Sequence, residues 1–527
     1  MKKRIFSIIL ATAMMLPIAG CGTGEKSADE TTTLTVAVFD RGNAPDGMTA
    51  TDNIWTEWIN ENFGKPNGIK VEFQGIPRNQ EVEKINMLMA SRSAPDILLT
   101  YDKSVFFNYA KSGGLADLTE LIESTENLKE FMGDRWKYTT YNDEIYGIPT
   151  KVISEGQYCS YIRKDWLDKL GLDVPETTEE LYTALKAFKE KDPGNVGENL
   201  VPFLLSATSF SEEYWQQNTL SLVMSFVEPM SEEEWYTLPQ IQYPGFKEGV
   251  RYLNKLYREG ILEQDFTLQT NWNQFDENIA AGRAGFYTHN RNYQLTSSGA
   301  YAMLLQNEPD AEFVAVDPYV NKYGKRPKWR GATGGGYIMI PKFSKNVEAA
   351  VKYLDWMANT DVGFTILNGN ENEHYRLENG YPVVIDTDYN NKTKFNNADL
   401  SIIYNGFDYG SFENNVEAMR VAMPELGELR ADSMIKAKSD LYNNPMDDFD
   451  QPIESYIKNK TKLDKKFQEL MIKSITASES DFDSVYDGLA QEYMTIGGDE
   501  VTEERKIVYK KCSEADTLPK DNPLINY

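Results

Sequence analysis

Charged side chains directly follow two of the strands that the sequence predicts. Asp40 and Arg41 come after the apolar run 34–39, and Asp102 comes after the run 96–101. Carboxylate and guanidinium groups make strong, charge-assisted hydrogen bonds, so they could hold the hydroxyl groups of a polar ligand. Open parallel sheets bind ligands beyond the carboxyl ends of their strands. The sequence therefore predicts that Asp40, Arg41 and Asp102 line a binding site.

Aromatic residues are abundant, with 31 Tyr, 24 Phe and 9 Trp. Trp55 and Trp58 fit the apolar stripe of a predicted helix, so we expect them in the core. Trp272 and Trp329 fit no such stripe, and we expect one of them to stack on the apolar face of a sugar-like ring. The further candidates are polar or aromatic residues near predicted strand ends and crossovers: Glu155, Tyr158, His289, Asn290, Arg330, His374 and Tyr375.

The sequence carries no motif of a known catalytic centre. It contains no HExxH, GxSxG or CxxC pattern, and its two histidines lie in different segments. The 81 acidic residues leave open a carboxylate pair of the kind that hydrolyses glycosides, but no motif singles one out. We therefore expect no catalytic residues and no cofactor.

Strands and helices alternate in the part of the chain that would position these side chains. Strands are predicted at 34–39, 69–73 and 96–101, with helices near 52–63 and 79–91 between them. This order predicts a parallel sheet with right-handed crossovers. A chain of 527 residues exceeds one compact core, so at least two α/β lobes are expected. The last hundred residues are predicted to be mostly helical.

The N-terminus reads as an export signal. A basic start, Met1 to Arg4, precedes the apolar run 5–15, which is too short to span a membrane. The run ends in Leu-Pro-Ile-Ala-Gly before Cys21, and this pattern resembles the lipobox of bacterial lipoproteins. The resemblance implies cleavage after residue 20 and lipidation of Cys21, with 21–33 as a flexible tether. A plain secretory signal with a chance cysteine is the alternative.

Charge and cysteine content limit the possible partners. The formal charge is -27, which argues against binding to nucleic acid or to anionic lipid headgroups. No second long apolar run appears, so we expect a lipid anchor on the extracellular face of the membrane and no membrane span. Cys159 and Cys512 could pair outside the cell, although solitary cysteines are more often buried as small hydrophobic residues.

Several stretches, taken in order, resemble the extracellular sugar-binding lipoproteins of ABC transporters, in their large maltose-binding-protein-like subfamily. They are 93–96 (SAPD), 143–149 (DEIYGIP), 161–172 (YIRKDWLDKLGL), 275–286 with its AGRAG, 340–350 (IPKFSKNVEAA) and 370–375 (NENEHY). The resemblance implies a two-lobed, type II periplasmic-binding-protein-like α/β fold. Each lobe would be a mainly parallel sheet flanked by helices, with extra helices at the C-terminus.

The same resemblance implies the division into lobes and the function. The N-terminal lobe would comprise 34–149 and 312–366, and the C-terminal lobe 150–311 and 367–527. A monomeric receptor would bind an oligosaccharide between the lobes and deliver it to the permease subunits of an ABC importer. A surface glycoside-active enzyme and a peptide-binding receptor remain alternatives.

One departure from the family pattern concerns calcium. Relatives often carry a calcium-binding loop after the helix that begins at the Thr177 capping box. Here the matching stretch keeps Asp192, but Gly194 and Val196 offer no side-chain oxygen. Calcium sites need oxygen ligands at alternate positions, so Asp192 is a weak metal candidate and no metal is expected. A second stretch, 386–391, is expected to be a polar turn.

Overall fold

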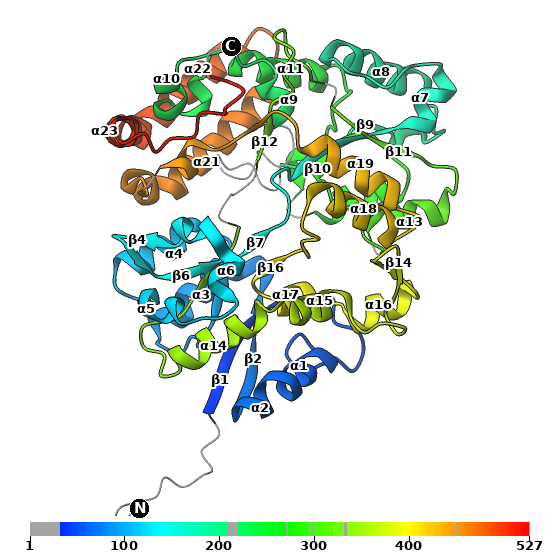
Figure 1. Ribbon diagram of the computed structural model, residues 1–527. Helices are drawn as coiled ribbons and strands as arrows, with labels where there is room; N and C mark the ends of the chain where they lie inside the picture. Colours follow the sequence, from blue (N-terminus) through cyan, green and yellow to red (C-terminus); the bar gives the residue numbers. More distant parts are fainter. Residues whose placement is uncertain are drawn as a thin grey trace, which may run out of the picture.

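The computed structural model describes residues 32–207, 220–269, 272–297, 299–317, 319–330, 335–449 and 451–525. The expected export signal, Cys21 and nearly all of the expected tether lie outside these ranges. Two lobes stand one above the other in Figure 1, with the N-terminal strand at the bottom of the first lobe. Each lobe has its own buried core, so each can hold its shape while the other moves.

The sheet of the first lobe combines two strand directions. β1 (Thr32–Asp40) and β2 (Ile69–Pro77) are parallel along their whole length. The residue before β3 (Leu98–Thr100) continues the sheet, because Ile97 pairs with Val36 in the parallel sense. β13 (Tyr337–Met339) then lies antiparallel between β3 and β6 (Gly147–Pro149).

Helices cover this sheet and join its core. Asn53 caps α1 (Ile54–Ile59) in a capping box with Thr56, and Asp102 caps α4 (Lys103–Lys111). The fully buried Phe63 packs edge-on against Tyr353 of α14 (Val347–Met357). The remaining helices of this core are α3 (Glu81–Ala90), α5 (Thr119–Glu123), α6 (Leu128–Met132), α15 (Thr360–Asn368) and α17 (Asn397–Leu400).

The second lobe is built on the strand order β11-β8-β10-β9. These strands are β8 (Tyr158–Arg163), β9 (Val201–Phe203), β10 (Ala284–Asn290) and β11 (Phe313–Val316). All six residues of β8 are buried, because cores lie on both faces of this sheet. The helices around it are α7 (Lys164–Leu170), α8 (Thr178–Lys191), α9 (Leu220–Met224), α12 (Asn273–Ala280), α13 (Ala300–Asn307), α18 (Phe412–Ala422) and α19 (Gly427–Ala437).

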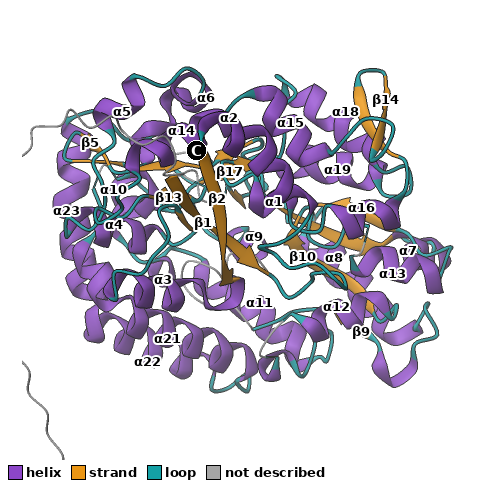
Figure 2. Ribbon diagram, turned by 90° about the horizontal axis from the view of Figure 1, so that it is seen from below, coloured by secondary structure: helices purple, strands orange, loops and turns teal. Residues whose placement is uncertain are grey.

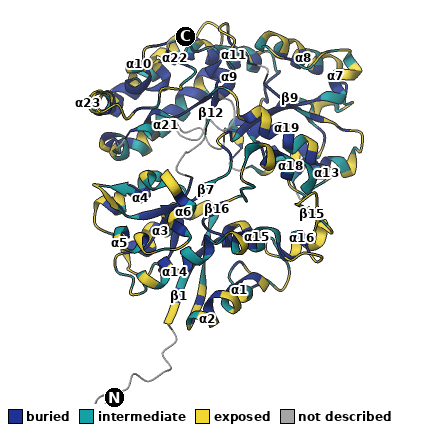
Figure 3. Ribbon diagram, viewed as in Figure 1, coloured by how far each residue is buried: buried dark blue, intermediate teal, exposed yellow. Residues whose placement is uncertain are grey.

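The C-terminal helices enlarge the second lobe. α21 (Glu454–Thr476), α22 (Phe482–Tyr493) and α23 (Asp499–Glu514) pack with α10 (Glu232–Thr237) and α11 (Phe246–Arg258). The predicted apolar stripes are buried here, including Phe467, Leu470 and Met471. Figure 2 shows these helices on the outside of the molecule, and Figure 3 shows that they are buried on their inner faces.

A short two-stranded ribbon joins the lobes. β7 (Lys151–Val152) runs parallel to β16 (Tyr404–Asn405), and the Lys151 N–H donates to the Ile403 carbonyl at 2.8 Å. Both strands lie between the lobes in Figure 1. Two strands of two residues make a narrow connection, which is suited to a hinge.

Two details of the fold differ from the sequence prediction. The sheets are mixed rather than mainly parallel. β13 re-enters the first lobe from the second and runs antiparallel to its neighbours, and in the second sheet β8 runs antiparallel to β10 and β11. The lobe borders expected at 312 and 367 also differ from those in the structure. β11, which follows the first border, pairs with β8 in the second sheet. Ile402 and Ile403, which follow the second border, lie in the core of the first lobe. β11 has only four residues, and so short a strand carries no sequence signal of the sheet it joins.

Candidate ligand-binding cleft

A cavity of about 1100 Å³ lies between the lobes. From the first lobe, α4, the 3-10 helix Gly133–Tyr138 and the turn between β4 (Thr140–Tyr141) and β5 (Glu144–Ile145) line it. From the second lobe, α20 (Pro445–Asp448) and the segment leading into α21 line it, together with residues of α23. We call this cavity the ligand cleft. Pockets for small molecules measure about 300–1,000 Å³, so the cleft can take a ligand of several linked rings.

Aromatic rings and charged groups share the wall of the ligand cleft. The rings belong to Phe107, Tyr138, Tyr141, Tyr337 and Phe449. Tyr138 lies beneath two cations, with Arg135 and Lys137 at 5.4 and 5.2 Å from its ring centre. Such a wall offers apolar faces for stacking beside polar groups for hydrogen bonds.

Several carboxylates of the ligand cleft already have partners within the protein. Glu504 accepts hydrogen bonds from the backbone N–H groups of Glu454 and Ser455 and so caps α21. Asp448 accepts from the hydroxyl of Tyr236 at 3.0 Å and from Asn443 at 2.8 Å. These groups hold the wall in place.

A second space of about 70 Å³ adjoins the ligand cleft, with which it shares lining residues, and we call it the inner pocket. Its lining is Arg135, Tyr138, Val152, Ser154, Glu155, Gln157 and Arg330. Arg135 Nη2 donates to the Thr150 carbonyl at 2.9 Å, and burial lowers the pKa of this guanidinium. Arg330 Nη2 donates to Asp521 at 3.1 Å, and its buried Nε has no hydrogen-bond partner among the described residues.

Of the sequence-predicted site residues, Glu155 and Arg330 lie in the ligand cleft together. Glu155 is exposed, and Arg330 is held by its N–H, which donates to the Tyr442 carbonyl at 2.8 Å. That bond extends the pairing of β12 (Lys328–Trp329) with β17 (Leu441–Tyr442). The second lobe therefore fixes the direction in which Arg330 leaves the sheet.

Asp40, Arg41 and Asp102 make contacts within the first lobe. Both Arg41 Nε and Nη2 donate to Asp399, at 2.7 and 2.8 Å, and this ion pair raises the pKa of Arg41. Asp102 accepts from the first turn of α4, and Asp40 accepts from the Gly42 N–H at 2.9 Å. Asp102 also lines a hollow of about 270 Å³ beside Arg78 and Tyr101.

Trp329 differs from its prediction because its ring is packed inside the second lobe. It stacks on Tyr158 with 5.3 Å between ring centres and is 6% exposed. Burial also raises the pKa of Tyr158. A ring covered in this way cannot stack on a ligand in this conformation, so Trp329 and Tyr158 are core residues here.

Trp272, His289 and Asn290 form a separate cluster in the second lobe. The Trp272 and His289 ring centres lie 4.8 Å apart, and His289 also stacks on Tyr293 at 4.0 Å. His289 is buried, which lowers its pKa to about 3, so the ring stays neutral. Asn290 Oδ1 accepts from the Asn292 N–H and closes a turn. None of these side chains lines the ligand cleft or the inner pocket.

His374, Tyr375 and Asp192 also serve the local structure. His374 is fully buried, accepts from the Asn370 N–H at 3.1 Å and packs against Trp55. Tyr375, in β14 (Tyr375–Glu378), packs edge-on against Phe364. Asp192 accepts from the Val196 and Gly197 N–H groups and so closes the turn after α8. Within the described ranges, no group of three or more His, Cys, Asp or Glu side chains could hold a metal ion.

Sequence reasoning missed most of the wall of the ligand cleft. The run Arg135-Trp136-Lys137-Tyr138 mixes cations and aromatic rings without a helical stripe, and this signal could have drawn attention to it. The second-lobe wall at 443–449 and 451–454 consists of the four-residue helix α20 and short irregular segments, which carry no periodic pattern in the sequence. The sequence alone does not show that these two walls face each other, because that depends on how the two lobes are arranged.

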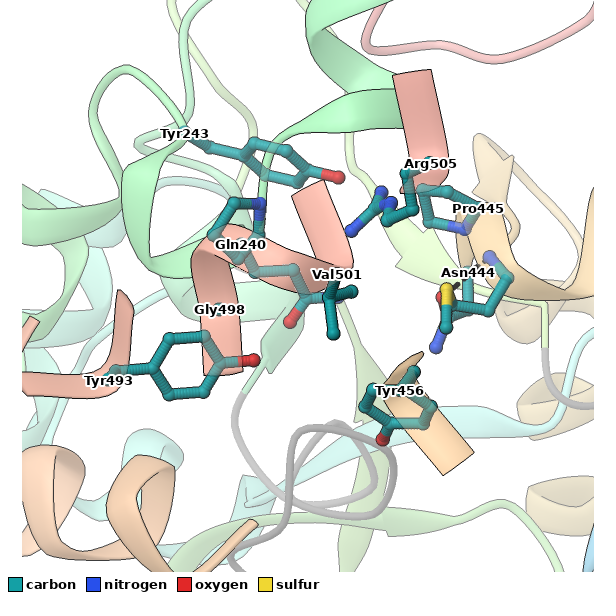
Figure 4. A pocket seen from close by; sticks show the side chains of 11 residues that line it. Gln240, Tyr243, Asn444, Pro445, Tyr456, Tyr493, Gly498, Val501 and Arg505 are labelled. Atoms are coloured by element: carbon teal, nitrogen blue, oxygen red, sulfur yellow. Dashed lines mark hydrogen bonds between the residues drawn. The ribbon is translucent and has the colours of Figure 1, made fainter. Parts of the chain in front are cut away.

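A smaller pocket, seen in Figure 4, lies inside the second lobe. Gln240, Tyr243, Tyr493 and Arg505 are among the residues that line it. Its volume of about 20 Å³ is close to the minimum of ~10–15 Å³ that holds one water molecule. It is therefore too small for an organic ligand.

Comparison with known protein families decides the family of the chain. The model of a family described as bacterial extracellular solute-binding protein matches residues 46–363. The chain belongs to that family. This match confirms the resemblance seen in the sequence. Separately, within the described ranges no helix has the length and apolar character needed to cross a membrane.

Individual members of the solute-binding protein family are similar to this chain over different shares of its length. The lipoprotein LipO of Bacillus subtilis is 28% identical over 62% of this chain and 66% of its own length. The polygalacturonan/rhamnogalacturonan-binding protein YtcQ, from the same organism, is 23% identical over 97% of this chain and 99% of its own length.

Solved structures confirm the fold class. An HMO binding, ABC-transporter associated solute-binding protein of Bifidobacterium longum infantis superposes with a TM-score of 0.68. The match covers 93% of this chain and 100% of that one, at 18% identity. The two-lobed α/β fold with added C-terminal helices is therefore as the sequence predicted.

Proposed function

We propose that this solute-binding protein is a receptor that binds an oligosaccharide in the ligand cleft and passes it to the permease of an ABC importer. The observation that carries the proposal is the cleft itself, a cavity of about 1100 Å³ lined by aromatic rings and polar groups from both lobes. Aromatic faces suit the apolar faces of sugar rings, and charged or amide groups suit their hydroxyls.

The names of relatives support a glycan as the ligand. YtcQ is named for binding polygalacturonan and rhamnogalacturonan, and its similarity extends over nearly the whole of this chain. A fructooligosaccharide ABC transporter substrate-binding protein, FusA of Streptococcus pneumoniae, is 25% identical over 67% of this chain. Both names favour a transport receptor for sugars over a receptor for peptides.

The proposal includes an anchor. Cleavage after residue 20 would leave Cys21 as the lipidated first residue, with a tether of about a dozen residues before β1. A tether of this polar composition is flexible, so the folded lobes could stand off the outer face of the membrane and reach the permease as a monomer. Stable anchoring requires more than one acyl chain, as lipoprotein processing supplies.

Binding and catalysis can be separated in one experiment. The protein is screened by thermal shift against plant, host and microbial oligosaccharides, and each mixture is then analysed for products. A receptor raises the unfolding temperature and leaves the sugar intact, whereas a glycoside-active enzyme releases shorter products. Stabilisation by peptide mixtures with no response to any glycan would contradict the proposal.

A further inference from the structure

We propose that the oligosaccharide carries a carboxylate, and that the guanidinium groups of Arg135 and Arg330 bind this carboxylate in the inner pocket. The inference rests on the proposed function, because it names the chemical class of ligand for the same cleft. The inference does not depend on the length of the sugar chain that occupies the rest of the ligand cleft.

The charge of the inner pocket is opposite to that of the whole protein. The chain has 81 acidic and 54 basic residues and a formal charge of -27. Among the described residues, the lining of the inner pocket nevertheless contains two guanidinium groups and one carboxylate, that of the exposed Glu155, while Asp521, the partner of Arg330, lies outside this lining. In so acidic a protein, two arginines beside each other in a small pocket are best explained by an anionic ligand group.

The two arginines come from opposite sides of the hinge. Arg135 belongs to the 3-10 helix of the first lobe, and its contact with Thr150 lies just before β7. Arg330 extends β12 of the second lobe. A buried ion pair between Lys328 and Asp317, with a distance of 2.7 Å, fixes the start of that strand. An anion between the two guanidinium groups would therefore draw the lobes together.

The contacts of each arginine within the protein leave it able to bind an anion. Arg330 is 16% exposed and pairs with Asp521, which is itself 69% exposed, so water competes strongly for that pair. The buried Nε of Arg330 has no partner in the described part of the chain. Arg135 lines the inner pocket, and its hydrogen bond from Nη2 to the Thr150 carbonyl goes to a neutral group. A carboxylate accepts two parallel hydrogen bonds from a guanidinium group.

Matched ligands test the inference on the full mature chain. Oligogalacturonates of three to five residues are compared by calorimetry with their carboxyl-reduced forms, in which each carboxylate becomes a hydroxymethyl group. We expect the acidic form to bind at least about tenfold more tightly, with an advantage that shrinks as NaCl is raised. Arg330→Gln and Arg135→Gln should each remove most of this advantage, because each lowers the affinity for the acidic form much more than the affinity for the reduced form. Asp521→Asn, which keeps the Arg330 guanidinium, should retain the tighter binding of the acidic form.

The possible failures are distinguishable. A screen can include acidic oligosaccharides and their carboxyl-reduced forms. If its preferred ligand is a neutral oligosaccharide, and Arg330→Gln binds that ligand as tightly as the parent does, the carboxylate inference is wrong and the receptor function stands. If monomeric galacturonate binds as tightly as its oligomers, the ligand is a small acid and the oligosaccharide part is wrong. If no oligosaccharide of the wider screen, acidic or neutral, binds to the folded protein, the proposed function fails and the inference fails with it.

Discussion

Lys103 Nζ donates a hydrogen bond of 2.9 Å to the carbonyl oxygen of Met446, and this bond crosses from one lobe to the other. Lys103 begins α4, whose apolar residues lie in the first core, whereas Met446 of α20 packs against the second core. At the other end of α4, about two turns away, Lys111 forms an ion pair with Glu454 at the start of α21. The helix α4 is therefore fastened to the second lobe at both of its ends.

We predict that removing both fastenings opens the protein. The double variant Lys103→Met, Lys111→Met should show a larger radius of gyration by small-angle scattering without ligand. The Lys103 hydrogen bond to a carbonyl and the exposed Lys111 ion pair are both weak contacts, so ligand affinity should fall by only about two- to fivefold. A control variant, Lys65→Met with Lys129→Met, removes two lysines whose partners, Glu61 and Glu123, lie in the same lobe. Equal scattering curves for both double variants would contradict the prediction.

The second prediction concerns Arg41, whose position after β1 suggested a role in ligand binding. Its bidentate pair with Asp399, which is 7% exposed, ties the end of β1 to α17. Arg41→Ala leaves a buried carboxylate without its partner, so the free energy of unfolding should fall by ~1–3 kcal/mol. Ligand affinity should change by less than about threefold.

Lys70→Ala is the control for this prediction, because Lys70 and its partner Glu72 are both well exposed in the same lobe. It should leave the stability unchanged. A variant Arg41→Ala with normal stability and a tenfold or greater loss of affinity would restore the original interpretation of Arg41 as a ligand-binding residue.

The third prediction separates a ring in the core of the second lobe from a ring in the wall of the ligand cleft. Trp329→Ala removes a buried ring that stacks on Tyr158, so it should cost ~3–5 kcal/mol of stability. Tyr138→Ala removes a half-buried ring of the ligand cleft. Loss of such an anchor costs ~2 kcal/mol in binding, or roughly a thirtyfold rise in the dissociation constant.

Calorimetry and thermal unfolding of both variants check this assignment. Tyr323→Ala provides the control, since Tyr323 is an exposed tyrosine that does not line the ligand cleft. The assignment is reversed if a folded Trp329→Ala loses ligand binding at unchanged stability while Tyr138→Ala binds normally.

The sequence predicted the fold better than the site, and the reason is physical. Apolar periodicity and turn residues report local structure, so β1, α1, β2 and α3 appear close to their predicted positions. A residue after a strand end can face a ligand or an adjacent segment of its own lobe, and only packing decides which. Arg41 faces Asp399, which is 358 positions away in the chain, and no local pattern reports such a pair.

The ligand cleft was harder to predict because two distant segments build it. Tyr138 and Phe449 line the same cavity although more than three hundred residues separate them. Two predicted site residues, Glu155 and Arg330, line the ligand cleft. Glu155 was selected because it follows a predicted crossover, and Arg330 because Trp329 and Arg330 fit no helical stripe and precede the glycine run before a predicted strand. The absence of a helical stripe also fits residues of short buried strands, and Trp329 is buried in this structure, whereas Trp272 is half-buried and lies outside the ligand cleft and the inner pocket.

The fourth prediction concerns the anchor. Cys21→Ala should release the protein from the membrane fraction into the medium, because the thiol that would carry the lipid is missing. Cys159→Ala is the matched control, as Cys159 is a free, buried cysteine and should leave membrane association unchanged. Retention of Cys21→Ala in washed membranes would rule out lipidation at this residue.

The last prediction is a pH dependence of stability that arises from Glu263. This carboxyl is buried beside Gln269 and Asn278, both of which donate to its Oε1, and burial raises its pKa to about 7. The unfolded chain releases this proton near pH 4.5, whereas the folded chain keeps it until about pH 7. Over that interval the folded state binds more protons, so stability falls as the pH rises.

Glu263→Gln keeps the acceptor for Gln269 and Asn278 and removes the titration. Relative to the parent, the variant should gain about 1–3 kcal/mol between pH 4.5 and pH 8, measured from urea unfolding midpoints. Glu277→Gln, at an exposed carboxylate of the neighbouring α12, should show no such gain. If Glu263→Gln and the parent have parallel pH profiles, Glu263 is ionised in the folded protein throughout this range, and its burial is compensated by the hydrogen bonds from Gln269, Asn278 and the Leu205 N–H.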